Sequence, residues 1–138
     1  MLLVLAFGCF DLPPDFEGAH LIPDFHQAEC SESAYDTGVG EPVATLAQND
    51  SESSVAVGPV GFRCAQDVQG FWIEANDGLS VLVQPIDMNP AAVAGCDCLY
   101  DLTMTLPSVT DRVEVWTRGD NQSGRSEPTL EATAALGD

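Results

Sequence analysis

The most distinctive local feature of the sequence is a pair of cysteines separated by one residue, Cys96 and Cys98. They begin a segment in which apolar and polar residues alternate up to Leu106, a pattern typical of a half-buried β-strand. Because side chains two apart on a strand point the same way, both sulfurs are expected on the apolar side. Three interpretations are open: a strained, redox-active bond between the two, a shared soft metal ion such as copper or zinc, or two bonds to distant cysteines.

Two further cysteines, Cys30 and Cys64, offer such distant partners. With Cys9 set aside, the four remaining cysteines form an even set, which is typical of a disulfide framework in an exported chain. We therefore predict two long-range disulfides among Cys30, Cys64, Cys96 and Cys98.

Catalysis by a Cys-His or Ser-His-Asp arrangement has little support, because the sequence contains only 2 His residues. The alternative to disulfides is a zinc or copper site that joins His20 and His26 to Cys96 and Cys98, although this spacing matches no metal motif. Neither a Gly-x-Ser-x-Gly nucleophile motif nor an acidic calcium-loop motif is present. We therefore expect a non-enzymatic protein without metal or other cofactor. A hydrolase that uses paired carboxylates stays open, because such pairs leave no linear signature.

Two tryptophans, Trp72 and Trp116, are predicted on the outward faces of their strands. Charged residues flank them in the sequence, namely Glu74, Arg112, Glu114 and Arg118. An aromatic patch ringed by charge is typical of a binding site. We therefore predict a binding surface for an unidentified protein or a carbohydrate ligand, made of Trp72, Trp116, Arg112 and Arg118. The alternative is that one or both indoles pack beneath the N-terminal segment or at a sheet edge.

The charge balance is strongly acidic. The chain has 22 Asp and Glu against 4 Arg and no Lys, a formal net charge of −18. Nucleic-acid binding depends on cations that neutralise phosphates, and anionic membrane surfaces repel such a chain. The composition therefore excludes nucleic acid and direct membrane-surface contact as partners. The favoured interpretation is that the acidity serves solubility alone. The alternative is that the carboxylates attract basic partners or divalent cations.

The first residues are apolar and end in Ala6-Phe7-Gly8-Cys9. This stretch resembles the lipobox of bacterial lipoproteins, whose cysteine is lipidated after cleavage of the leader. It departs from that pattern at Ala6, where Leu is usual, and at Phe7, where a small residue is usual, and no basic segment precedes it. The resemblance implies a truncated export leader over residues 1–8, a lipid anchor on Cys9, and a location in the cell envelope or outside the cell. The alternative is a buried strand over residues 2–10.

The elements that would position these residues are short strands. Residues 9–42 are rich in Pro, Gly, Ser and acid, which indicates a tether or a loosely packed lead-in. Residues 43–136 predict one all-β domain, an antiparallel β-sandwich of about six or seven short strands. The candidate strands are residues 43–47, 55–57, 61–64, 71–75, 79–83, 96–106, 113–117 and 129–136, the last as a strand rather than a short helix.

A hairpin is predicted around Asn76-Asp77-Gly78. A three-residue loop makes one face wholly apolar, because it pairs apolar residues throughout and puts Gly78 in a left-handed conformation. The predicted pairs are Phe71 with Val83, Ile73 with Val81, and Ala75 with Leu79.

Together these patterns favour a non-enzymatic, exported and lipid-anchored envelope domain that acts in binding or scaffolding. The alternative is an envelope metal-handling or thiol-redox protein centred on Cys96 and Cys98.

Overall fold

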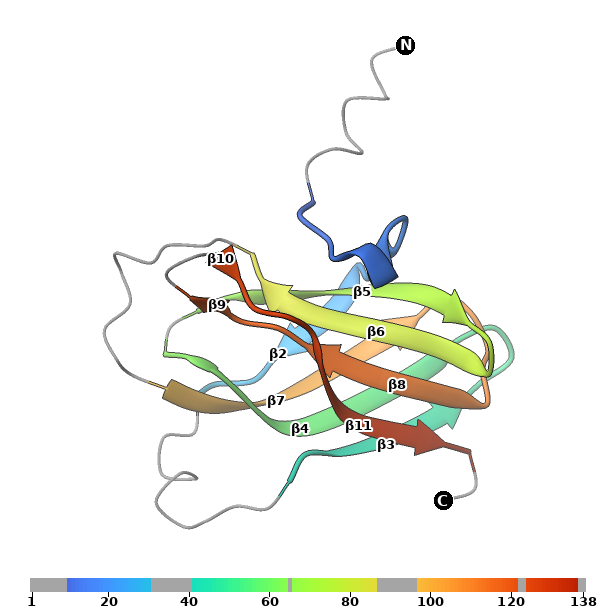
Figure 1. Ribbon diagram of the computed structural model, residues 1–138. Helices are drawn as coiled ribbons and strands as arrows, with labels where there is room; N and C mark the ends of the chain where they lie inside the picture. Colours follow the sequence, from blue (N-terminus) through green and yellow to red (C-terminus); the bar gives the residue numbers. More distant parts are fainter. Residues whose placement is uncertain (1–9, 31–40, 65, 87–96, 122–123, 137–138) are drawn as a thin grey trace.

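A computed structural model describes residues 10–30, 41–64, 66–86, 97–121 and 124–136 of the chain. Within these residues the protein is all-β, with a five-stranded sheet facing a four-stranded sheet and no α-helix (Figure 1). The predicted sandwich is therefore confirmed. The described strands outnumber the predicted six or seven, chiefly because the N-terminal lead-in also supplies strands.

The five-stranded sheet has the order β1-β5-β6-β8-β11. Its strands are β1 (His20–Leu21), β5 (Val68–Ala75), β6 (Gly78–Pro85), β8 (Arg112–Thr117) and β11 (Thr129–Ala135). All neighbours in it are antiparallel except β6 and β8, which are parallel. This parallel pair arises because the strand between them in the sequence, β7 (Asp97–Leu106), belongs to the opposite sheet.

The four-stranded sheet has the order β2-β7-β4-β3 and is antiparallel throughout. The remaining members are β2 (Asp24–Gln27), β3 (Val43–Gln48) and β4 (Ser53–Arg63). The two short strands predicted at 55–57 and 61–64 are one strand, β4, whose pairing register shifts between Val57 and Val60. Pro59 lies in this irregularity. It is tolerated there because proline has no N–H to donate and a bulge leaves that ladder hydrogen bond unmade. A separate ribbon pairs β9 (Asp120–Asn121) with β10 (Gly124–Arg125).

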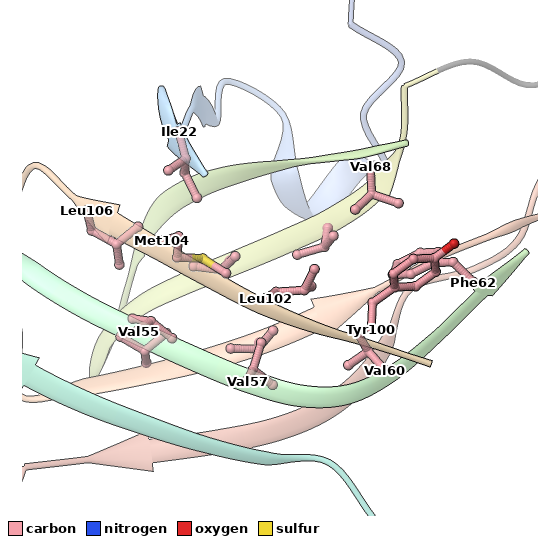
Figure 2. Close-up of a cluster of buried hydrophobic side chains, with 14 of the residues drawn as sticks. Ile22, Val55, Val57, Val60, Phe62, Val68, Tyr100, Leu102, Met104 and Leu106 are labelled. Carbon is pink, nitrogen blue, oxygen red and sulfur yellow. The ribbon is translucent and has the colours of Figure 1, made fainter. Parts of the chain in front are cut away.

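The core lies between the two sheets, and Figure 2 shows its centre. The predicted alternation of β7 is confirmed, because its inward residues are all buried, namely Cys98, Tyr100, Leu102, Met104 and Leu106. The alternation of β8 is confirmed as well, with Val113 and Val115 inward and fully buried. The segment at 129–136 is the predicted strand.

The lead-in is part of the sandwich from Phe10 to Cys30. A 3₁₀ turn, η2 (Pro14–Phe16), is followed by β1 at the edge of one sheet and β2 at the edge of the other. Between these strands Ile22 is buried, and its N–H donates to the Gly70 carbonyl at 2.9 Å. A Cβ on Gly70 would lie 2.8 Å from the Phe25 ring, so the absent side chain makes room for the crossing chain.

The predicted register of the β5–β6 hairpin is wrong. The turn has two residues, Asn76 and Asp77, and the pairs are Trp72 with Val81 and Phe71 with Leu82. The predicted register gives the hairpin one apolar, buried face and one exposed face. Instead β6 is buried on both faces over most of its length, so apolar residues occur at both parities and their alternation does not define the inward side.

As a result Trp72 points the opposite way from the prediction. It shares its row with Val81 and Val115, which are core residues, and it packs against the core. Trp116 shares its row with Leu82 on the outer face of the same sheet. The two indoles therefore lie on opposite faces and cannot form one surface.

Gly78 provides a test of how closely β6 approaches β8. Its φ is 151°, and an added Cβ would lie 2.1 Å from the Arg112 carbonyl oxygen. We expect Gly78→Ala to lower the free energy of unfolding by about 1–3 kcal/mol, because the two strands must separate to accept the methyl group. The control is Gly119→Ala, where nothing lies within 4 Å, and it should be neutral or slightly stabilising. Urea unfolding of both variants measures the difference, and equal stabilities would contradict this packing.

Candidate functional site

The outer face of the five-stranded sheet carries side chains in rows that cross the strands. One row is apolar and consists of Phe71, Leu82, Trp116 and Leu130. At its β5–β6 end the row is covered by the lead-in, so Phe71 and Leu82 are fully buried, and the Phe10 ring packs edge-on against Phe71 at 4.9 Å. The next row is more polar and consists of Ile73, Ser80, Glu114 and Thr133.

Where the lead-in stops covering this face, a hollow of about 400 Å³ opens beside Trp116. We call it the Trp116 hollow. Three separate parts of the chain line it: the η2 turn, the outer face of strands β5, β6 and β8, and the segment before β11. The lining residues are Asp15, Phe16, Ile73, Glu74, Ala75, Asn76, Ser80, Glu114, Trp116, Glu127 and Pro128. Its size falls within the range of about 300–1,000 Å³ typical of ligand sites.

Glu114 holds the Trp116 indole in place. The indole Nε1–H donates to Glu114 Oε1 at 3.3 Å, and Arg112 Nη1 donates to Glu114 Oε2 at 3.3 Å. Because residues 112, 114 and 116 share one side of β8, the strand itself brings these three side chains together. The hollow thus has an aromatic wall whose orientation is fixed before any ligand arrives.

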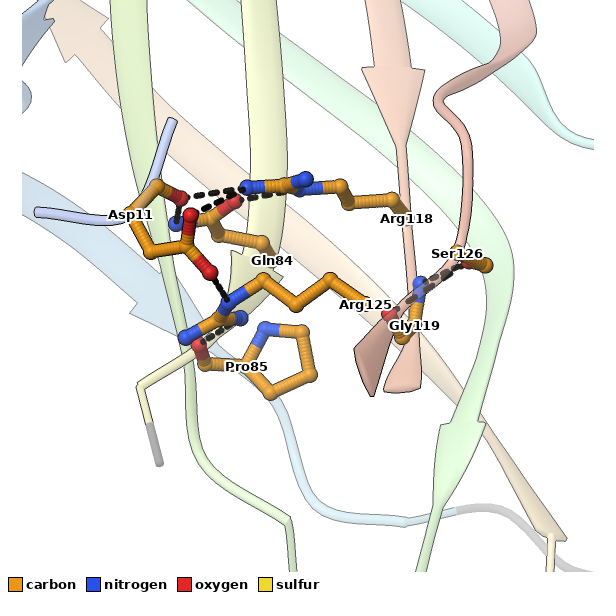
Figure 3. Close-up of polar contacts among 7 residues, drawn as sticks. All are labelled: Asp11, Gln84, Pro85, Arg118, Gly119, Arg125 and Ser126. Carbon is orange, nitrogen blue, oxygen red and sulfur yellow. Dashed lines mark hydrogen bonds and ion pairs between the residues drawn. The ribbon is translucent and has the colours of Figure 1, made fainter. Parts of the chain in front are cut away.

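A second group of contacts fixes the lead-in next to the hollow; Figure 3 shows this group, which we call the Asp11 latch. Arg118 Nε donates to Gln84 Oε1 at 2.8 Å, and Arg118 Nη2 donates to the Asp11 carbonyl. Gln84 Nε2 donates to the same carbonyl at 3.1 Å. Arg125 Nε donates to Asp11 Oδ2 at 3.1 Å and its Nη1 to the Pro85 carbonyl at 2.8 Å.

Gln84 and Arg118 of the latch are buried, whereas the Asp11 side chain is 69% exposed. Gln84 is 1% exposed and Arg118 is 8% exposed. Burial lowers the pKa of the Arg118 guanidinium, the nearby Asp11 carboxylate raises it, and Arg125 lowers it. Arg118 stays charged, since an arginine pKa starts far above physiological pH. The latch therefore fixes the wall formed by Asp15 and Phe16 a few residues along the chain.

The structure separates the four residues predicted as a binding surface. Trp72 faces the core, and Arg118 is buried in the Asp11 latch. Trp116 lines the hollow, and Arg112 supports it through Glu114. The residues that sequence reasoning missed are Asp15, Phe16, Glu127 and Pro128. They come from segments without periodicity, and the one available signal was an aromatic residue, Phe16, directly after a Pro-rich stretch.

Three cysteines gather at the other sheet. Cys30 and Cys98 form a disulfide with a Cα–Cα distance of 5.4 Å and a sequence separation of 68, which is one of the long-range pairings that the sequence left open. Cys64 is disulfide-bonded as well, and the Sγ atoms of Cys30, Cys64 and Cys98 lie within 4.8 Å of one another. Sulfur atoms in disulfides are not thiolate ligands, so metal binding here requires prior reduction. Cys96 lies outside the described residues, and the metal or redox alternative stays a prediction.

The two histidines lie apart from this sulfur group. The His20 ring packs against the Trp72 ring at a centroid distance of 4.8 Å. His26 Nε2 lies 3.0 Å from Asp24 Oδ1, and both side chains are exposed on the outer face of the four-stranded sheet. His26 and Asp24 border a second hollow of about 430 Å³. Its other lining residues are short Thr, Ser and Ala residues together with Leu46, Val55 and Met104. This hollow has no aromatic wall, so the Trp116 hollow is the better candidate site.

The chain matches no protein-family model, no curated protein and no solved structure. Among the described residues, no helix has the length and hydrophobicity to cross a membrane. The predicted lipidation site, Cys9, lies outside the described residues.

The Asp11 latch makes a testable contribution to stability. We expect Arg118→Met to lower the free energy of unfolding by about 1–3 kcal/mol, because Gln84 and the Asp11 carbonyl lose a buried donor. The control, Arg112→Met, removes a partly exposed ion pair and should cost less than about 1 kcal/mol. Chemical denaturation measures both. A larger loss for Arg112→Met than for Arg118→Met would contradict the latch.

Proposed function

We propose that this protein is a non-enzymatic domain of the cell envelope, exported and anchored by lipid at Cys9, that binds a partner through the Trp116 hollow. One observation carries the binding role: an aromatic side chain, held by Glu114, forms a wall of an open hollow that three separate chain segments build together. Aromatic side chains in concave sites supply most of the contact energy in recognition.

The hollow has the composition of a recognition site. Its apolar lining consists of Phe16, Ile73, Trp116 and Pro128, and its polar lining includes the carboxylates of Asp15, Glu114 and Glu127. The indole N–H is already hydrogen-bonded, so a ligand meets a ring that does not need to reorganise. Such preorganisation lowers the entropic cost of binding.

The anchoring role is supported by the apolar run that ends in Ala6-Phe7-Gly8-Cys9. Phe10 and Asp11 pack on the five-stranded sheet directly after this cysteine. A lipid on Cys9 would therefore be joined to the folded domain without an intervening flexible tether.

Anchoring is tested by cell fractionation in the native host. The wild-type chain should appear in the membrane fraction, and Cys9→Ser should move it to the soluble fraction, because a thioether-linked lipid needs the cysteine sulfur. Mass spectrometry of the mature protein should show acyl chains on Cys9. A mature chain that keeps an unmodified Met1 would refute the anchor while leaving the binding role intact.

The binding role is tested with arrays of glycans and of peptides of varied charge. We expect the purified domain to retain at least one class of these ligands, and Trp116→Ala to weaken that binding by about 1–2 kcal/mol or more. The matched control is Val109→Ala, which also removes an exposed apolar side chain but lies away from the hollow, and it should bind normally. The role is rejected if Trp116→Ala retains every ligand as well as the wild type does.

A further inference from the structure

We propose that the Trp116 hollow takes a cationic side chain, arginine ahead of lysine, presented by a basic polypeptide partner. This inference rests on the proposed binding function and names the class of ligand for that same site. It follows from the negative charge of the hollow, from its apolar walls and from the engagement of the chain's own arginines in internal contacts.

The charge of the hollow is uncompensated. Three carboxylates line it, those of Asp15, Glu114 and Glu127, and no described cationic side chain lines it with them. Glu74 also borders the hollow, but it shares its row with the core residues Leu79 and Val113, so its side chain belongs to the other face of the sheet. Glu114 is engaged by Arg112 and by the Trp116 indole. Asp15 and Glu127 make no ion pair with any residue in the described part of the chain. Carboxylates held around one opening repel one another, and a bound cation relieves that repulsion.

The walls suit the rest of such a side chain. Ile73 and Pro128 offer apolar contact to the methylene stem of an arginine or lysine, and the buried Phe16 closes the wall behind them. A guanidinium stacks on an indole and forms paired hydrogen bonds with a carboxylate, whereas an ammonium does neither as well. Trp116 and a neighbouring carboxylate should therefore bind arginine more tightly than lysine. A neutral sugar would use the aromatic wall but would leave the two unpaired carboxylates, Asp15 and Glu127, uncompensated.

The partner is a different molecule from this chain. All four arginines of the sequence are engaged: Arg112 with Glu114, Arg118 and Arg125 in the Asp11 latch, and Arg63 in contacts of its own. A second copy therefore has no spare cation to insert. The net charge of −18 also repels a second copy and attracts a basic polypeptide over long range.

The test uses two capped peptides, Gly-Arg-Gly-Arg-Gly and its citrulline counterpart, which has the same shape without the charge. Binding is followed by NMR through the Nε1–H signal of Trp116, with that of the inward-facing Trp72 as an internal reference. We expect the arginine peptide to shift the Trp116 signal but not the Trp72 signal. It should bind about tenfold more tightly than the citrulline peptide at low salt, with the advantage falling as salt is added.

Charge variants separate the hollow from the overall charge of the protein. Glu127→Gln should lower the affinity for the arginine peptide about threefold to tenfold, since it removes one of the unpaired carboxylates. Glu52→Gln changes the net charge equally but lies in the turn between β3 and β4, and it should bind as the wild type does. Equal losses in both variants would overturn the proposal, as would an arginine peptide that leaves the Trp116 signal unmoved. A neutral oligosaccharide or the citrulline peptide binding at Trp116 as tightly as the arginine peptide would overturn the cation preference while keeping the binding function.

Discussion

The five-stranded sheet buries apolar side chains on both of its faces, and the N-terminal segment is placed to satisfy that requirement. On β6, Val81 and Val83 face the opposite sheet, whereas Leu82 and Gln84 face outward and are equally buried. The cover for the outward pair comes from residues 10–17, because Phe10 and Phe16 pack there. A polar lead-in with a few aromatic residues thus becomes a third, partial layer of the sandwich. The η2 turn of that layer lies beside β5 (Figure 1). The hollow is lined by this turn on one side and by Glu114 and Trp116 of β8 on the other.

The scarcity of cations explains where the fold uses them. Two of the four arginines, Arg118 and Arg125, converge on Asp11, a single residue at the start of the described chain. Burying Arg118 is costly unless its donors are satisfied, and Gln84 with the Asp11 carbonyl accepts from it. A third arginine, Arg112, aligns Glu114 behind the indole. The 22 acidic residues far outnumber the 4 arginines, which leaves the protein with a net charge of −18.

Sequence reasoning succeeded where a strand has one buried face and failed where it has two. The alternation of β7 from Cys98 to Leu106 predicts its inward side, because polar residues occupy the other side. The β5–β6 hairpin has apolar residues at both parities, so the same rule chose the wrong register and sent Trp72 outward. The lead-in strands were missed because β1 has 2 residues and β2 has 4, too few to display a period. The Trp116 hollow was predictable only through Trp116 itself, since its other walls come from remote segments.

The Asp11 latch joins positions 107 and 114 residues apart in the sequence. The parallel pairing of β6 with β8 likewise needs β7 to have crossed to the other sheet before it can form. Contacts of this kind give a fold a high contact order, and β-sandwiches of high contact order fold on the millisecond-to-second scale. During synthesis the N-terminal layer cannot dock until nearly the whole chain has emerged. Until then the apolar outer row, with Phe71 and Leu82, stays uncovered and available to chaperones or to aggregation.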